Sequence, residues 1–64
     1  MTDIQIRDEG TIILLTPTTT AGRDWCAEWL GDDCPRFGAS YVVEHRYAAD
    51  ILDGMTDDGL TVAA

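Results

Sequence analysis

Carboxylates are the most abundant side chains here that could do chemistry, and eight of them fall in two groups at helical spacing. The chain carries 12 acidic residues against four arginines, and it has no lysine. The two groups are Asp24, Glu28, Asp32 and Asp33, and Asp50, Asp53, Asp57 and Asp58. Carboxylates three or four residues apart on a helix lie about 5–6 Å from each other, on the same scale as phosphates along a DNA strand. The pattern therefore indicates two negative stripes that imitate a short length of phosphate backbone.

Four of these acids stand at unfavourable places, because Asp32-Asp33 and Asp57-Asp58 lie at the ends of predicted helices. A helix exposes unpaired carbonyls and the negative end of its dipole there, so carboxylates cost roughly a few tenths of a kcal/mol or more. Function is one reason for a sequence to break such a local rule. Solubility is the other, since acidic residues keep small proteins dispersed.

Other reactive side chains give no catalytic or metal-binding pattern. The dozen acids offer no preferred pair for acid–base chemistry. His45, the single histidine, could serve Ser40 or Cys34 as a base, but its odd spacing from Ser40 puts the two on opposite faces of a strand. Cys26, Cys34 and His45 lack the close spacing of zinc ligands. We therefore expect a surface histidine, no enzymatic activity, no metal and no cofactor. Two cysteines in a cytosolic protein are more often free thiols than a disulfide, but the sequence leaves a Cys26–Cys34 bridge open.

Size and charge limit the classes of function. The chain has 64 residues and a net charge of −8, which indicates a single small acidic domain over residues 1–64. Such a domain has a thin core and little room for a deep cleft. It should repel DNA, RNA and anionic lipid, and should be attracted to basic surfaces. The sequence shows no bilayer-spanning run and no secretory signal pattern, so we expect the cytosol of the cell that makes the protein. The oligomeric state is left open, with a monomer as the default.

Strand patterns occur in four segments, which are residues 4–7, 11–16, 39–44 and 60–62. The first two flank Asp8-Glu9-Gly10 and predict a hairpin, preceded by a frayed start at residues 1–3. The continuous apolar run at 11–16 is typical of a central strand covered on both faces or nearly so. In the third strand, Tyr41 and Val43 should share one face and Val42 the other.

Two helices are predicted between these strands. The first runs from Ala21 to Leu30, with threonines before it as caps and Gly31 after it. The second occupies the stretch from Tyr47 to Gly59, where Gly59 stops it. The apolar residues expected inside are Tyr47, Ile51, Leu52 and Met55 on the second helix, and Trp25 and Trp29 on the first. With residues 34–38 as a loop, the order is β-β-α-β-α-β, an α+β fold in which two helices pack on a four-stranded sheet.

Several stretches carry a resemblance to a known class of small proteins. They are GTIILLTP, the Trp-bearing helix, and YVVEHRYAADILDGMTDDGLTV, with Val42-Val43-Glu44, Arg46-Tyr47 and Asp58-Gly59-Leu60 as the shared motifs. The chain resembles small proteins encoded by phages and mobile elements of proteobacteria, and is similar to some anti-CRISPR proteins of the type I-C class. The resemblance implies inhibition of the multisubunit surveillance complex, Cascade, through a subunit's DNA-facing basic surface. It brings no catalytic residues.

Two hypotheses for function follow. The first is a non-enzymatic inhibitor whose eight helix-associated acids occupy a basic DNA-binding surface of a host CRISPR complex subunit and block target DNA. In this hypothesis charge speeds encounter and sets specificity, while a few apolar contacts hold the complex. The second is a phage regulatory adaptor that binds a host protein through an apolar or aromatic patch at Trp29, Phe37 or Tyr41.

Overall fold

The chain begins with an antiparallel hairpin in the computed structural model, which describes residues 1–64. Strand β1 (Ile4–Asp8) pairs with β2 (Ile12–Pro17), and Ile6 lies opposite Leu15. Gly10 takes a φ of 95° in the connecting turn, and its N–H donates to Asp8 Oδ1 at 2.8 Å. A residue with a Cβ rarely adopts such a φ. The predicted hairpin and its glycine turn are confirmed.

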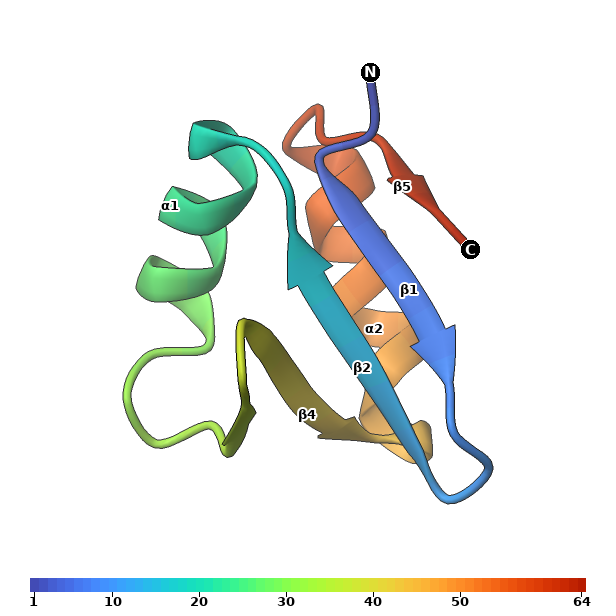
Figure 1. The fold of residues 1–64 in the computed structure, drawn as a ribbon. Coiled ribbons are helices and arrows are strands. Elements are labelled where there is room, and N and C mark those ends of the chain that lie inside the picture. Colours follow the sequence, from blue (N-terminus) through green and yellow to red (C-terminus); the bar gives the residue numbers. More distant parts are fainter.

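Three further strands complete a five-stranded sheet in the order β3-β4-β2-β1-β5 (Figure 1). Strand β4 (Ser40–Glu44) runs antiparallel to β2, and β5 (Val62–Ala63) runs parallel to β1. The edge strand β3 (Arg36–Phe37) pairs with β4. The expected four-stranded sheet is therefore wrong by one strand, and the order is β-β-α-β-β-α-β. Strand β3 has only two residues, which follow a proline and are too few to show the alternation of a strand. It is recognised as a strand only because it pairs with β4.

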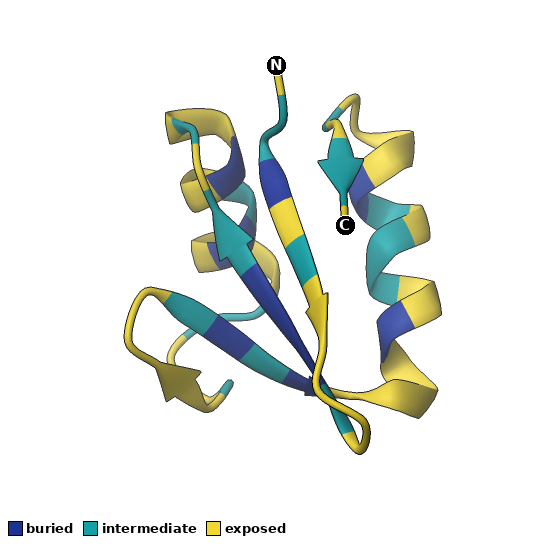
Figure 2. Cartoon of the chain, turned by 45° about the vertical axis from the view of Figure 1, so that its right-hand side comes forward, coloured by how far each residue is buried: buried dark blue, intermediate teal, exposed yellow.

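Both helices, α1 (Thr20–Trp29) and α2 (His45–Asp57), pack on one face of this sheet. The register puts Ile13, Leu15, Tyr41 and Val43 on that face, and they form one buried cluster with Cys26 of α1 and Met55 of α2. Figure 2 shows the buried positions of the helices turned toward the sheet and their other sides exposed. The molecule is a mixed α/β fold of two layers, as expected. Neither helix has the length or apolar character needed to cross a lipid bilayer.

The other face of the sheet carries no helix. Leu14, on that face, is nevertheless only 8% exposed, because side chains of neighbouring strands surround it. The prediction that residues 11–16 form a central strand is confirmed, but only one of its faces is covered by helices, and Leu14 and Thr16 line a hollow on the other face. Tyr41 and Val43 share the helix-covered face, as the alternation predicted.

Local sequence patterns predict both ends of α1, but they misplace the beginning of α2. Thr19 caps α1 by accepting the Gly22 N–H at 3.1 Å, and Gly31 follows the helix with a φ of 65°. Helix α2 begins at His45, directly after β4, so its expected start at Tyr47 is two residues late. It ends at Asp57, before Gly59 with a φ of 89°.

Two aromatic residues that we expected in the core are exposed. Trp29 is 63% exposed and Tyr47 is 51% exposed. The buried residues of α1 are Gly22 and Cys26, and Trp29 follows at the next position of the same stripe, so helical spacing does not distinguish Trp29 from a buried residue. Trp25 is half-buried because α2 covers it at Gly54, whereas Trp29 lies one turn further along. Of the residues expected inside α2, Met55 is buried, and Ile51 and Leu52 are half-buried.

Asp3 ties the start of the chain to two distant segments, so the frayed start expected for residues 1–3 is wrong at this position. One carboxylate oxygen accepts the Thr19 hydroxyl at 2.6 Å, and the other accepts the Thr61 N–H at 2.9 Å. These hydrogen bonds join β1 to the cap of α1 and to the segment before β5. Both partners are remote in the sequence, so no local pattern predicts them.

The same hydrogen bonds make the stability of the fold depend on pH. They lower the pKa of Asp3 below its ordinary value, and the Gly10 N–H and His45 lower that of Asp8. A carboxyl with a depressed folded-state pKa contributes stability above its unfolded pKa of about 4, and this stability is lost as pH falls through the folded pKa. We expect Asp3→Asn to lower the melting temperature at pH 7 and to lose its disadvantage against the wild type as the pH falls through the folded-state pKa of Asp3.

The measurement is thermal unfolding by circular dichroism at a series of pH values. Asp24→Asn is the matched control, because its exposed carboxylate accepts no hydrogen bond from the protein. A constant difference between wild type and Asp3→Asn from pH 7 to about pH 2 would show that the carboxylate charge is unimportant at this junction.

Candidate functional site

All eight carboxylates of the predicted site are exposed, and five of them lie on the outer face of the helix layer. On α1, Asp24 and Glu28 are four residues apart, and each is two positions from the buried Cys26. Two positions on a helix correspond to a rotation of about 200°, so both carboxylates point away from the sheet. Helix α1 thus presents one pair of negative charges outward.

Helix α2 presents three more carboxylates on its own exposed side. Asp50, Asp53 and Asp57 are spaced by three and four residues, which places them on one face of the helix. The residues that face the sheet are Ala48 and Met55, each two positions from one of these acids. Both helices pack on the same face of the sheet, so each stripe lies on the side of its helix that is turned away from the sheet. We call these five residues, Asp24, Glu28, Asp50, Asp53 and Asp57, the outer carboxylates.

The remaining three acids of the predicted site lie beside this layer and not on its outer face. Asp32 and Asp33 are exposed in the turn that follows α1. Asp58 is the C-terminal cap of α2, and its Oδ2 accepts a hydrogen bond from the Trp25 indole N–H at 2.7 Å. This contact between the helices gives Asp58 a local structural role. The unfavourable position of Asp58 at the helix end therefore has a compensation that the sequence did not reveal.

No arginine neutralises the outer carboxylates. The ion pairs of the structure join Arg7 to Glu9, His45 to Asp8 and Arg46 to Glu44, at 3.0–3.1 Å. Arg36 instead lies over the Tyr41 ring at 4.1 Å. Neither helix carries a basic residue in its last turn, so nothing there offsets the dipole beside Asp57. The outer carboxylates are consequently free of ion pairs, although Arg46 lies one turn before Asp50 on the same side of α2 and Arg23 directly precedes Asp24 on α1.

The candidate nucleophiles and the histidine are not brought together. The Ser40 hydroxyl shares a hydrogen bond of 2.6 Å with Thr16, and His45 Nε2 lies 3.1 Å from Asp8 Oδ1. Cys34 Sγ donates to the Val42 carbonyl at 3.4 Å. No hydrogen bond joins His45 to Ser40 or to Cys34. His45 is exposed, as expected, but it holds the end of the hairpin to the start of α2.

Both cysteines are free thiols, and Cys26 is the less accessible of the two. Burial raises the pKa of Cys26 to about 11, and burial also raises that of Cys34. The thiolate is the reactive form, so both side chains react slowly at neutral pH. No group of three or more His, Cys, Asp or Glu side chains is arranged to hold a metal ion.

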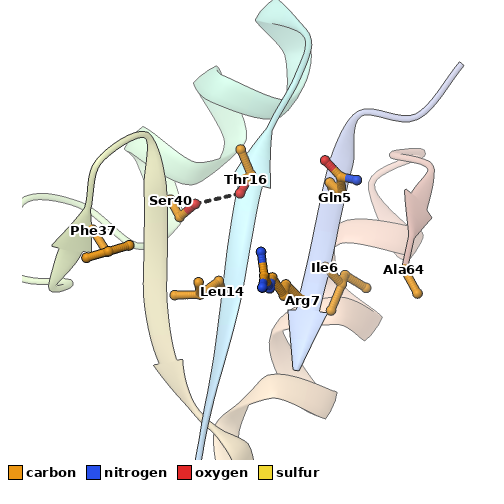
Figure 3. A pocket seen from close by; sticks show the side chains of 8 residues that line it. All are labelled: Gln5, Ile6, Arg7, Leu14, Thr16, Phe37, Ser40 and Ala64. Carbon is orange, nitrogen blue, oxygen red and sulfur yellow. Dashed lines mark hydrogen bonds between the residues drawn. The ribbon is translucent and has the colours of Figure 1, made fainter. Parts of the chain in front are cut away.

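Two hollows lie on different sides of the molecule. The larger, about 500 Å³, lies on the open face of the sheet and includes Arg7, Leu14 and Phe37 (Figure 3). Its single charged side chain, Arg7, is paired with Glu9. The smaller hollow, about 310 Å³, is an apolar groove beside β4 that includes Leu30, Tyr47 and Ile51.

The three aromatic residues of the adaptor hypothesis do not form one patch. Phe37 is 71% exposed at the hollow on the open sheet face, whereas Trp29 lies on α1 on the opposite side of the sheet. Tyr41 is only 6% exposed, inside the core. The spacing of Tyr47 along the helix predicts a core position, but the residue is exposed. Its place directly after Arg46, near the beginning of the helix, is the signal that could have marked it as a boundary residue.

Comparisons of the chain with models of protein families, with curated proteins and with solved structures return no match.

Proposed function

We propose that this protein is a non-enzymatic inhibitor that occupies a Lys- and Arg-lined DNA-binding surface through its outer carboxylates. The observation that carries the proposal is that five exposed carboxylates lie on the sides of two helices that are turned away from the sheet, and that no arginine forms an ion pair with any of them. A surface that binds phosphates recognises negative charge at that spacing, and the net charge of −8 favours fast encounter with it.

We propose that the target is a subunit of a type I-C CRISPR surveillance complex, because the chain resembles anti-CRISPR proteins of the type I-C class. Binding at the DNA-facing surface of this complex would exclude target DNA by competition. The proposed site of action is the bacterial cytosol, where the complex operates. The outer carboxylates act as ligands for the partner's basic side chains, and they carry out no chemical step.

The test is competition between this protein and target DNA for purified type I-C Cascade. We expect the protein to displace labelled DNA, and its apparent affinity to fall about tenfold or more when salt is raised from about 50 to 300 mM, because screening weakens charge contacts. The measurements are fluorescence anisotropy of the DNA and direct binding of the protein. Simultaneous binding of DNA and protein to one complex, or affinity independent of salt, would contradict the proposal.

The adaptor hypothesis is kept as a second candidate because Trp29 and Phe37 are both exposed. Since they lie on opposite sides of the sheet, an adaptor would use one of them and not both. This alternative differs in its response to salt, because an apolar patch binds about equally at low and high ionic strength.

A further inference from the structure

The apolar groove lies where the C-terminal end of α1, strand β4 and the beginning of α2 meet. Seven of its nine lining residues are hydrophobic, and its volume is about 310 Å³. Leu30 and Cys34 come from the end of α1 and the loop after it, Val43 from β4, and Tyr47 and Ile51 from α2. A volume of this size is at the lower end of the range for ligand pockets, and it accommodates one or two large side chains.

The walls of the groove leave apolar surface in contact with water. Tyr47 is 51% exposed, and Leu30, Cys34 and Ile51 are half-buried. This small domain has five aromatic side chains in all, counting two Trp, two Tyr and one Phe. Covering an apolar surface of this kind is favourable by about 25 cal/mol per Å². The groove is therefore a place where a partner's apolar side chain gains affinity.

The turn beside the groove is acidic, because Asp32 and Asp33 lie between Leu30 and Cys34, which both line the groove. Glu44 also lines it, but its carboxylate is paired with Arg46, whose Nε is 3.0 Å away and whose guanidinium lies over the Tyr47 ring at 4.9 Å. Asp32 and Asp33 form no ion pair, so these two carboxylates are complementary to a Lys or Arg of the partner.

We infer that this groove binds a large apolar side chain of the protein partner, carried on a segment in which Lys or Arg flanks that side chain. The inference rests on the proposed function and deepens it. The outer carboxylates would speed encounter with the basic surface, and the groove would supply the buried contact that slows dissociation. Asp32 and Asp33, which lie off the outer face of the helices, would pair with the flanking basic residues.

Three synthetic peptides serve as probes of the groove. The first has a central Leu flanked by two Arg on each side, between Gly-Ser ends; the second replaces Leu by Ser, and the third replaces the Arg residues by Glu. Cys34 lines the groove and reports on its occupancy, while the fully buried Cys26 is an internal reference. The readout is the rate of Cys34 alkylation by iodoacetamide at about pH 9, where thiolate is present, followed by mass spectrometry.

We expect a saturating amount of the Arg–Leu peptide to slow alkylation of Cys34 about threefold or more, and the other two peptides to leave it unchanged. Tyr47→Ser should weaken binding of the Arg–Leu peptide about tenfold, because it removes one apolar wall. Phe37→Ser is the matched control, since Phe37 is exposed on the opposite side of the sheet, and it should leave binding unchanged. Equal protection by all three peptides, protection by none, or equal losses in the two variants would overturn the inference.

The groove and the proposed function fail in distinguishable ways. If Tyr47→Ser leaves both peptide binding and displacement of DNA from Cascade at wild-type levels while salt still weakens that displacement, the groove inference is wrong and the inhibitor proposal stands. If the groove binds the Arg–Leu peptide but the protein does not compete with DNA for Cascade, the groove stands and the DNA-competing inhibitor is wrong.

Discussion

Reversing the charge of Asp53 and Asp57 together should weaken displacement of DNA from Cascade by about 100-fold or more. Close charge pairs across interfaces are coupled by about 1.5 kcal/mol at the low end, so the loss of two amounts to about 3 kcal/mol. Both residues are exposed on the outer face of α2 and accept no hydrogen bond from a side chain. The measurement is DNA competition with the Asp53→Lys/Asp57→Lys variant.

The fold should survive this double substitution. Asp57 is the last residue of α2, where a cation interacts favourably with the helix dipole, so lysine there is neutral or slightly stabilising. Asp58 is left in place because its carboxylate accepts the Trp25 indole N–H. Circular dichroism and the melting temperature of the variant should match those of the wild type within a few degrees.

A matched control distinguishes the effect of where the charges lie from the effect of net charge. Lysine at Gln5, Glu9 and Thr11 together changes the net charge by the same +4, but on the exposed surface of the hairpin. We expect this variant to keep most of its inhibition. If it loses as much as the Asp53/Asp57 variant, net charge alone determines binding and the array of outer carboxylates has no special role.

Substituting Gly22 by alanine should destabilise the protein by about 2 kcal/mol, even though alanine is the better helix former. A Cβ on Gly22 would lie 2.4 Å from the backbone oxygen of Asp3 and 3.1 Å from Ile4 Cδ1. Because the obstacle is backbone, α1 must move away from β1, and this also strains the Asp3–Thr19 hydrogen bond. For a domain of this size the melting temperature should fall by about 8–16 °C.

Gly54→Ala is the matched control for this effect. Its Cβ would meet a ring carbon of Trp25 at 3.4 Å, an ordinary contact, so the gain in helix propensity should remain at up to about 1 kcal/mol. The measurement is chemical or thermal unfolding of both variants. A Gly22→Ala protein as stable as the wild type would mean that the packing of α1 on β1 is looser than the structure shows.

Local rules account for the parts of the fold that were predicted well. The alternation of apolar and polar residues, together with a glycine turn, predicts the first hairpin. Threonines before Ala21 and a glycine after Leu30 predict where α1 begins and ends. Each of these features depends on residues close in sequence. The edge strand at Arg36–Phe37 was missed because it exists only by pairing with β4, and the role of Asp3 was missed because Thr19 and Thr61 are distant along the chain.

The burial of aromatic residues was predicted least well, for a related reason. Trp25 and Trp29 have the same residue type and share one stripe of α1, yet only Trp25 is covered by α2. Similarly, Tyr47 has the spacing of a core residue, but it lies at the beginning of α2, where no element covers it. Whether an apolar side chain is buried depends on the neighbour across the interface, which periodicity does not identify.

For the candidate site, the sequence by itself determined the charge and the spacing of the carboxylates along each helix. Helical geometry turns a spacing of three or four residues into a stripe without any tertiary contact. Only the tertiary structure decided that both stripes are exposed on helices of one layer, because both helices bury their apolar sides on one face of the same sheet. It also decided that Asp58 bonds to Trp25, since that contact joins residues brought together only when the helices pack.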